Sequence, residues 1–127
     1  MRLTLKDDLP FTTIRIAYRG IEIDVSNILV DTGSASTILA ADSVARIGIM
    51  PEPEDMLYTI RGVGGTEVVF TRQIDYVQVN QQRLAQFEVE IGGMDYGFDI
   101  NGILGMDFLT QAGVVINLRD LRLEFLE

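Results

Sequence analysis

The sequence contains no cysteine and no histidine among its 127 residues. Without cysteine the chain forms no disulfide, and its composition leaves the redox compartment open. Without histidine or cysteine it cannot assemble a Ser-His-Asp triad, a Cys-His dyad or the common zinc sites built from these ligands. Catalysis would therefore have to rest on carboxylates, lysine, tyrosine, or a metal held by oxygen atoms.

Long apolar runs are also missing. No stretch approaches the roughly 20 apolar residues that a membrane-spanning helix needs. The N-terminal residues 1–8 lack the long apolar region of a secretory signal. We therefore expect no membrane span and a cytoplasmic location. The chain is 47% hydrophobic, enough for a substantial core, and its length suits one domain over residues 1–127.

Basic residues are scarce, with 10 Lys and Arg against 19 Asp and Glu and a net charge of −9. This balance argues against a nucleic-acid partner, which needs a basic face. It is compatible with a neutral or basic peptide partner. The simpler explanation, which we favour, is that the acidic surface keeps the protein soluble.

Apolar and polar residues alternate along most of the chain, which predicts mostly β structure. The predicted strands are residues 14–18, 21–25, 28–30, 37–39, 58–60, 66–70, 73–79, 84–91, 114–116 and 121–125. Short helices are expected at residues 42–47, ending at Gly48, and at residues 106–111. Ala40 and Ala41 precede the first helix, so we expect it to lack a good N-terminal cap.

One segment points to chemistry. The apolar residues 28–30 deliver Asp31 into a small turn made by Thr32, Gly33 and Ser34. A carboxylate at the end of a buried strand is costly unless it is hydrogen-bonded or shares a proton. The competing interpretation is a turn-forming aspartate that bonds its own backbone, which is common for an isolated Asp.

Two further elements favour catalysis. The first is a hairpin that contains Ile60 and has a glycine-rich tip formed by Gly62, Val63, Gly64 and Gly65. The second is an apolar-apolar-glycine element immediately before the short helix at 106–111. It consists of Ile103, Leu104 and Gly105.

In this order, the three elements resemble the retropepsin-like aspartic proteases, the single-domain type with one Asp-Thr-Gly per chain. The resemblance covers roughly residues 11–125. It implies a half-barrel with one or two short helices that forms a two-fold homodimer. It also implies that the hairpin with Ile60 is a flap over the substrate, and that residues 103–105 pack beside the catalytic turn.

The same resemblance implies an aspartic endopeptidase that needs no metal or other cofactor. The Asp31 carboxylates of two chains would activate one water, and Thr32 would link the two turns by hydrogen bonds across the dimer axis. A peptide or protein substrate would lie extended along an apolar lining that comprises Ile38, Ile60, Val63 and Ile103. We expect Ser34 to donate a hydrogen bond to Asp31, which would favour the ionised carboxylate and an acidic pH optimum.

Two other functions stay open at this point. The same fold could serve as a dimeric peptide-binding or scaffolding module with little or no proteolysis. An oxygen-ligand metal site using Asp31 with Asp99 or Asp107 is weaker, because no spacing matches a calcium loop. For Asp107 we favour a simpler role as a negative charge near a helix N-terminus. For Met94, Tyr96 and Phe98 we favour a loop that packs on the core.

Overall fold

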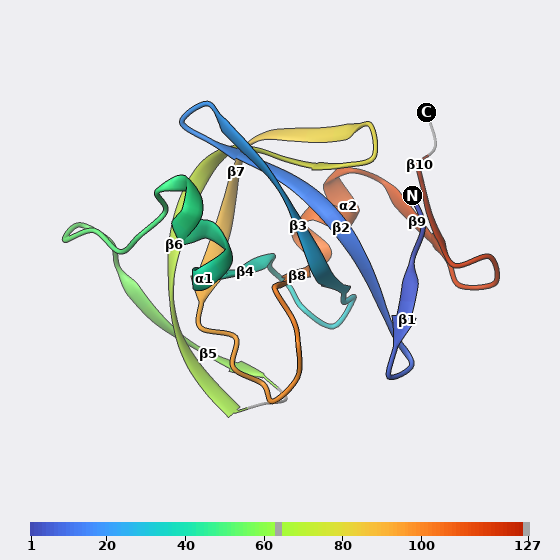
Figure 1. The fold of residues 1–127 in the computed structure, drawn as a ribbon, viewed down its shortest axis with the longest axis horizontal. Helices are drawn as coiled ribbons and strands as arrows, with labels where there is room; N and C mark the ends of the chain where they lie inside the picture. Colours follow the sequence, from blue (N-terminus) through green and yellow to red (C-terminus); the bar gives the residue numbers. More distant parts are fainter. Residues whose placement is uncertain (63–64, 126–127) are drawn as a thin grey trace.

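The computed structural model describes residues 1–62 and 65–125, and strands dominate it (Figure 1). The strands are β1 (Thr4–Lys6), β2 (Leu9–Tyr18), β3 (Ile21–Val30), β4 (Ile38–Ala40), β5 (Leu57–Gly62), β6 (Gly65–Val79), β7 (Gln82–Gly92), β8 (Gly102–Leu104), β9 (Val114–Asn117) and β10 (Arg122–Phe125). The helices are α1 (Ala41–Val44), which continues as the 3₁₀ turn η1 (Ala45–Ile47), and α2 (Met106–Gln111). The predicted mostly-β class is confirmed.

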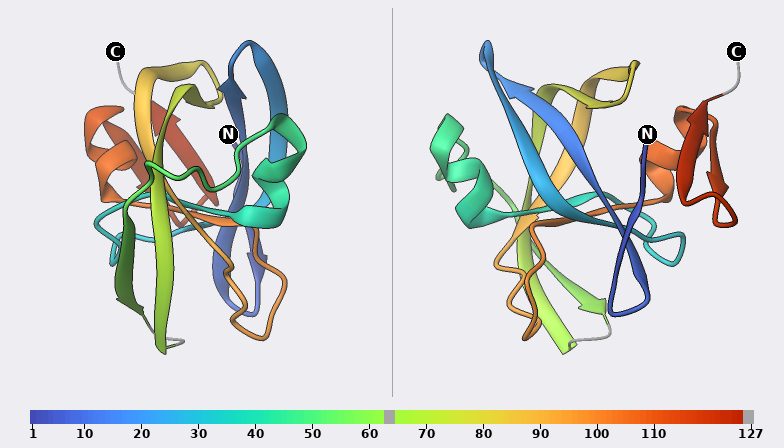
Figure 2. Two further views of the ribbon diagram at one scale, coloured as in Figure 1. Left: turned by 90° about the vertical axis from the view of Figure 1, so that its left-hand side faces the viewer. Right: turned by 45° about the vertical axis from the view of Figure 1, so that its right-hand side comes forward.

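Eight strands form one sheet in the order β1-β2-β3-β8-β4-β7-β6-β5. Strand β2 also pairs with β6, which joins the two ends of the run β2-β3-β8-β4-β7-β6 and closes it on itself. The views in Figure 2 show the resulting barrel, with α2 and the β9–β10 hairpin on one side. Residues 1–3 lie beside β10, where the Leu3 amide donates to the Leu121 carbonyl at 2.8 Å.

Strand β8 lies between β3 and β4 although it comes more than 60 residues later in the chain. It runs parallel to β3, with Leu29 opposite Ile103, and antiparallel to β4, with Ile38 opposite Ile103. The connection between β3 and β4, residues 31–37, therefore has to pass around the end of β8. We call this connection the Asp31 loop.

Several strands are longer than their sequence patterns predicted, and β6 and β3 each join two predicted segments. Residues 66–70 and 73–79 belong to one strand, β6, because the polar pair Thr71–Arg72 continues its pairing with β7. Residues 21–25 and 28–30 likewise belong to one strand, β3. Asn27 has a left-handed φ of 57°, which asparagine tolerates better than most residues, so the chain kinks without leaving the sheet. The short strand β1 was not predicted.

The first helix confirms two smaller expectations. Its N-cap residue, Ala40, makes no side-chain hydrogen bond to the helix, and the helical segment is capped at its C-terminal end by Gly48, whose φ of 87° is the left-handed conformation that glycine adopts freely. The helical segment is split, since only its first turn is α-helical and the rest is 3₁₀. No helix among the described residues is long and apolar enough to cross a bilayer.

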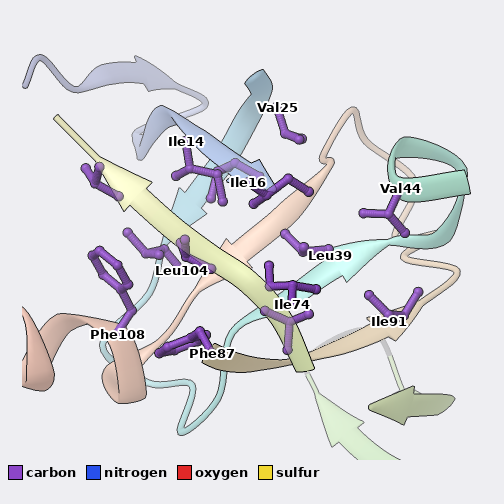
Figure 3. Packing of buried hydrophobic residues seen from close by; sticks show 14 of the residues in the cluster. Ile14, Ile16, Val25, Leu39, Val44, Ile74, Phe87, Ile91, Leu104 and Phe108 are labelled. Carbon is purple, nitrogen blue, oxygen red and sulfur yellow. The ribbon is translucent and has the colours of Figure 1, made fainter. Parts of the chain in front are cut away.

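Buried side chains form two clusters. The larger fills the barrel, and Figure 3 shows Ile14, Ile16, Leu39, Leu104 and Phe108 pointing toward one another within it. The alternation that predicted the strands explains this core, because Ile14 and Ile16 are buried while the intervening arginine is exposed. The second cluster is smaller. It packs the β5–β6 hairpin against β2, β4 and the connection between β7 and β8. Its buried members are Phe11, Ile38, Ala40, Val69, Met94 and Ile100.

Candidate active site

Asp31 follows directly after β3, at the end of a strand whose last residue, Val30, is buried. Its amide donates to the Leu104 carbonyl of β8 at 3.1 Å, which fixes the backbone where the loop begins. Its carboxylate Oδ1 accepts a hydrogen bond from the Gly33 amide at 2.8 Å. The Asp31 side chain is only partly buried. The carboxylate is thus oriented by the backbone and open to a second reactant.

The turn after Asp31 faces outward, since Thr32 and Gly33 are both exposed in the single chain. Gly33 sits tightly against the carboxylate. A Cβ atom added there would lie 3.1 Å from Asp31 Oδ1, closer than most real Cβ contacts. A side chain at this position would therefore crowd the carboxylate that the Gly33 amide holds.

The expected role of Ser34 is wrong in this structure. Its hydroxyl donates to the Ser36 carbonyl at 2.8 Å and not to Asp31. A serine hydroxyl has one hydrogen to donate, and here the loop backbone uses it. Ser34 therefore stabilises the shape of the Asp31 loop, and the expectation of an acidic pH optimum loses its basis in this residue.

Residues 103–105 and the start of α2 hold the Asp31 loop from the other side. The Met106 amide donates to the Ser34 carbonyl at 2.8 Å, and the Asp107 amide donates to the Ala35 carbonyl at 3.1 Å. A Cβ atom on Gly105 would lie 2.2 Å from the Ser36 carbonyl oxygen, which is inside van der Waals contact. The loop can approach β8 this closely only because residue 105 is glycine.

Asp107 does more than place a charge near a helix start. It lies in the first turn of α2, as expected, and its Oδ1 accepts a hydrogen bond from the Phe108 amide. It also binds Thr37 twice, accepting from the amide at 3.1 Å and from the hydroxyl at 2.7 Å. The Thr37 hydroxyl in turn accepts a hydrogen bond from the Gly105 amide at 3.1 Å. Thr37 and Asp107 therefore fix the far end of the Asp31 loop.

Sequence reasoning missed this pair because its members are 70 positions apart. The available signals were weak: a threonine just before a buried strand, and an aspartate at the start of a short helix. Neither residue indicates its partner. Only the insertion of β8 between β3 and β4 brings them together.

A pocket of about 480 Å³ opens beside the loop. The loop contributes Ser36, whose hydroxyl hydrogen-bonds Glu90 of β7, and α2 contributes Asp107. Tyr58 of β5 and Phe87 of β7 also line it. The largest share of the lining comes from β7, so the pocket lies over this strand between α2 and the base of the β5–β6 hairpin, and it meets the Asp31 loop only at Ser36.

The β5–β6 hairpin is present up to its last described pair, Gly62 opposite Gly65. Val63 and Gly64, which we expected at the flap tip, lie outside the described residues. Ile60 of β5 and Ile103 of β8 are partly buried and pack on the second cluster, as does the fully buried Ile38. The structure thus brings Ile38, Ile60 and Ile103 together, although Ile38 has little surface to offer a substrate.

The alternative metal site gains no support from the carboxylates involved. Asp99 accepts a hydrogen bond from Asn27 Nδ2 at 2.9 Å, and both oxygens of Asp107 are engaged by Thr37 and Phe108. Among residues 1–62 and 65–125, no three acidic side chains come together as a metal ion would require.

Comparison with known proteins places this geometry in a family. The sequence model described as "gag-polyprotein putative aspartyl protease" matches residues 21–111, which include the Asp31 loop, the β5–β6 hairpin and β8. The fold resembles the crystal structure of a retropepsin-like aspartic protease from Rickettsia conorii, with a TM-score of 0.66 and 17% identity over 98% of this chain and 97% of that chain. The comparison with curated proteins gives no match. Since the family model spans well over half of the sequence, the chain belongs to the retropepsin-like aspartyl protease family.

Proposed function

We propose that this single domain, residues 1–127, is an aspartic endopeptidase that works as a homodimer. The observation that carries the proposal is the Asp31 loop itself. The loop presents one partly exposed carboxylate that a backbone amide orients. Backbone hydrogen bonds with β8 and α2 hold the loop in place. The family match adds an independent reason to read this carboxylate as catalytic.

A dimer is proposed because each chain supplies half of the required pair. An aspartic protease needs two carboxylates facing one water, an arrangement for which such enzymes are the standard example of coupled titration. This sequence has one Asp-Thr-Gly. A two-fold axis would set each Asp31 against its symmetry mate, and the exposed Thr32 would hydrogen-bond across that axis.

The proposed reaction needs no covalent intermediate and no cofactor. Two neighbouring carboxylates cannot both ionise easily, so the pair shares one proton. The ionised member takes a proton from water as the water attacks the scissile carbonyl. The protonated member donates to the carbonyl oxygen and stabilises the negative charge that develops there. Proton transfer to the leaving amine then completes cleavage.

Substrate would lie extended between the β5–β6 hairpin, acting as a flap, and the floor formed by β3, β4 and β8. An extended peptide can pair its backbone with strands on both sides. Ile60 and Ile103 offer partly exposed apolar surface along this path, which favours hydrophobic side chains near the cleaved bond. Gly62, Val63, Gly64 and Gly65 would form the part of the flap that covers the peptide.

The test is cleavage of a diverse peptide library between pH 3 and 8 by wild type and by Asp31→Asn. We expect the substitution to abolish cleavage and to preserve the fold, because it removes both catalytic carboxylates and changes neither side-chain size nor the hydrogen bond from Gly33. Asp24→Asn is the matched control, since Asp24 is an exposed aspartate whose ion pair with Arg15 contributes little. Wild-type activity in Asp31→Asn would refute the assignment. Peptide binding without cleavage by the wild type would favour the non-proteolytic module.

A further inference from the structure

Glu67 connects two parts of the molecule that border the proposed substrate path, the β5–β6 hairpin and the connection between β7 and β8. It lies on β6, opposite Ile60 in the β5–β6 hairpin. Its Oε2 accepts a hydrogen bond from the Tyr96 hydroxyl at 2.6 Å, and its Oε1 accepts one from the Met94 amide at 2.5 Å. Met94 and Tyr96 belong to residues 93–101, the connection between β7 and β8. We call this connection the 93–101 loop.

The contact is close enough to constrain the neighbouring sequence. A Cβ atom on Gly92 would lie 2.7 Å from Glu67 Oε1, so a side chain at the end of β7 would displace the Glu67 carboxylate from this position. The Glu67 side chain is half-buried. In Figure 1 the 93–101 loop, in orange, extends toward the same end of the molecule as the β5–β6 hairpin, and the hydrogen bonds of Glu67 join the two segments.

The other end of the 93–101 loop is attached to β3 and β4, at the end of β8 opposite the Asp31 loop. The Asn101 amide donates to the Asn27 carbonyl of β3 at 2.9 Å, and the Ala40 amide of β4 donates to the Asn101 carbonyl at 2.9 Å. Asn27 Nδ2 also donates to Asp99. The 93–101 loop thus runs from the hairpin, through Glu67, to the two strands that flank the Asp31 loop.

Apolar packing follows the same path. Met94 is buried and Tyr96 partly buried in the second cluster, which also contains Val69 of β6 and receives Ile60 of β5. Packing alone is tolerant of small shifts, whereas a carboxylate with two directed hydrogen bonds fixes one relative position. Glu67 is therefore the residue that sets how the hairpin and the 93–101 loop sit relative to each other.

We propose that Glu67 is a positioning residue for peptide binding, which holds the strands of the β5–β6 hairpin and the 93–101 loop in one relative position before a peptide binds. This role rests on the proposed peptidase function. Without the Glu67 hydrogen bonds, a bound peptide would have to order the two segments itself, and that ordering lowers affinity. The Asp31 loop is held by separate contacts, so the chemical step stays intact once the peptide is bound.

The decisive variant is Tyr96→Phe, which removes one hydrogen bond and keeps the aromatic ring. Tyr76→Phe is the matched control, because the buried Tyr76 hydroxyl has no hydrogen-bond partner among the described residues. We expect Tyr96→Phe to raise KM for a cleaved library peptide about tenfold, with kcat within about twofold of wild type. Tyr76→Phe should change neither constant.

A second set of variants tests the contribution of the Glu67 carboxylate to peptide binding. Glu67→Ala should raise KM more than Tyr96→Phe does, because it removes both acceptors. Glu67→Gln keeps one acceptor oxygen and should rescue part of the loss. An equal KM in Tyr96→Phe, Glu67→Ala and wild type would overturn the proposal, as would a fall in kcat at unchanged KM.

Two measurements distinguish a failure of the Glu67 role from a failure of the proposed peptidase function. Hydrogen exchange of the Met94 amide should accelerate in Glu67→Ala whether or not the protein cleaves anything, which reports that the Glu67 contact itself has been broken. Affinity for a statine-containing peptide, measured by calorimetry, should fall about tenfold in Tyr96→Phe even without turnover. Faster exchange with unchanged affinity would show a merely structural contact and refute the positioning role. A wild type that neither cleaves nor binds peptides would overturn the peptidase function and this role with it.

Discussion

Thr37→Val tests whether the Asp31 loop is held by the network described above. Thr37 is completely buried, and valine has nearly the same shape. The substitution removes the hydroxyl that donates to Asp107 at 2.7 Å and accepts from the Gly105 amide at 3.1 Å. The Thr37 amide still reaches Asp107, so the change is confined to one polar atom.

The magnitude follows from the two lost contacts. A hydrogen bond to a carboxylate contributes about 2 kcal/mol, and a buried amide left without an acceptor costs about 2 kcal/mol. Replacing a hydroxyl by a methyl group recovers about 1 kcal/mol through apolar burial. We therefore expect the free energy of unfolding to fall by about 3 kcal/mol, which corresponds to a melting temperature about 10 °C lower for a chain of this size.

The assay is thermal and urea unfolding followed by circular dichroism at one fixed protein concentration, because dimerisation also affects stability. Thr12→Val is the control, since Thr12 is buried to a similar degree and its hydroxyl has no partner within residues 1–62 and 65–125. That variant should be as stable as wild type or more stable. If the two variants differ by less than about 1 kcal/mol, the network does not hold the loop as argued.

Three further predictions concern Gly105, the proposed dimer and Tyr96. Gly105→Ala should lower kcat/KM about 100-fold, because its Cβ would displace the loop at Ser36; wild-type kinetics would contradict the close approach. Specific activity should fall on dilution as dimers dissociate, and a fully active monomer by light scattering would rule out the shared site. Burial and the Glu67 carboxylate raise the pKa of Tyr96, so the folded state keeps a proton that the unfolded chain loses above pH of about 10. Wild type should therefore lose stability above that pH, and urea titrations of Tyr96→Phe should show a smaller loss.

The strands could be predicted from the sequence because alternation reports burial directly. It identified the hairpin around Gly20 and the last two strands, β9 and β10. It failed where a polar residue continues a strand, as at Arg72 in β6 and Asn27 in β3. Arg72 interrupts the apolar pattern because it hydrogen-bonds Tyr18 and Asp55 across the structure, and no local signal reveals those partners.

The site was predictable in part, and for a similar reason. Asp31 and its turn are contiguous in the sequence, so the motif can be recognised before the fold is known. The contacts that brace the motif join residues far apart in the chain, such as Thr37 with Asp107 and Glu67 with Tyr96. Ser34 shows a third limit, because the acceptor of its hydroxyl, the Ser36 carbonyl, can be identified only once the geometry of the loop is known.

The central claim is that one active site requires Asp31 from two chains. It is tested most directly by mixing wild type with Asp31→Asn at constant total concentration, allowing subunits to exchange, and measuring peptide cleavage against the wild-type fraction. If both carboxylates are needed, activity follows the square of that fraction, so an equal mixture retains about a quarter of the wild-type rate. Activity that falls linearly, to about half in the equal mixture, would show that each chain acts alone and would contradict the account.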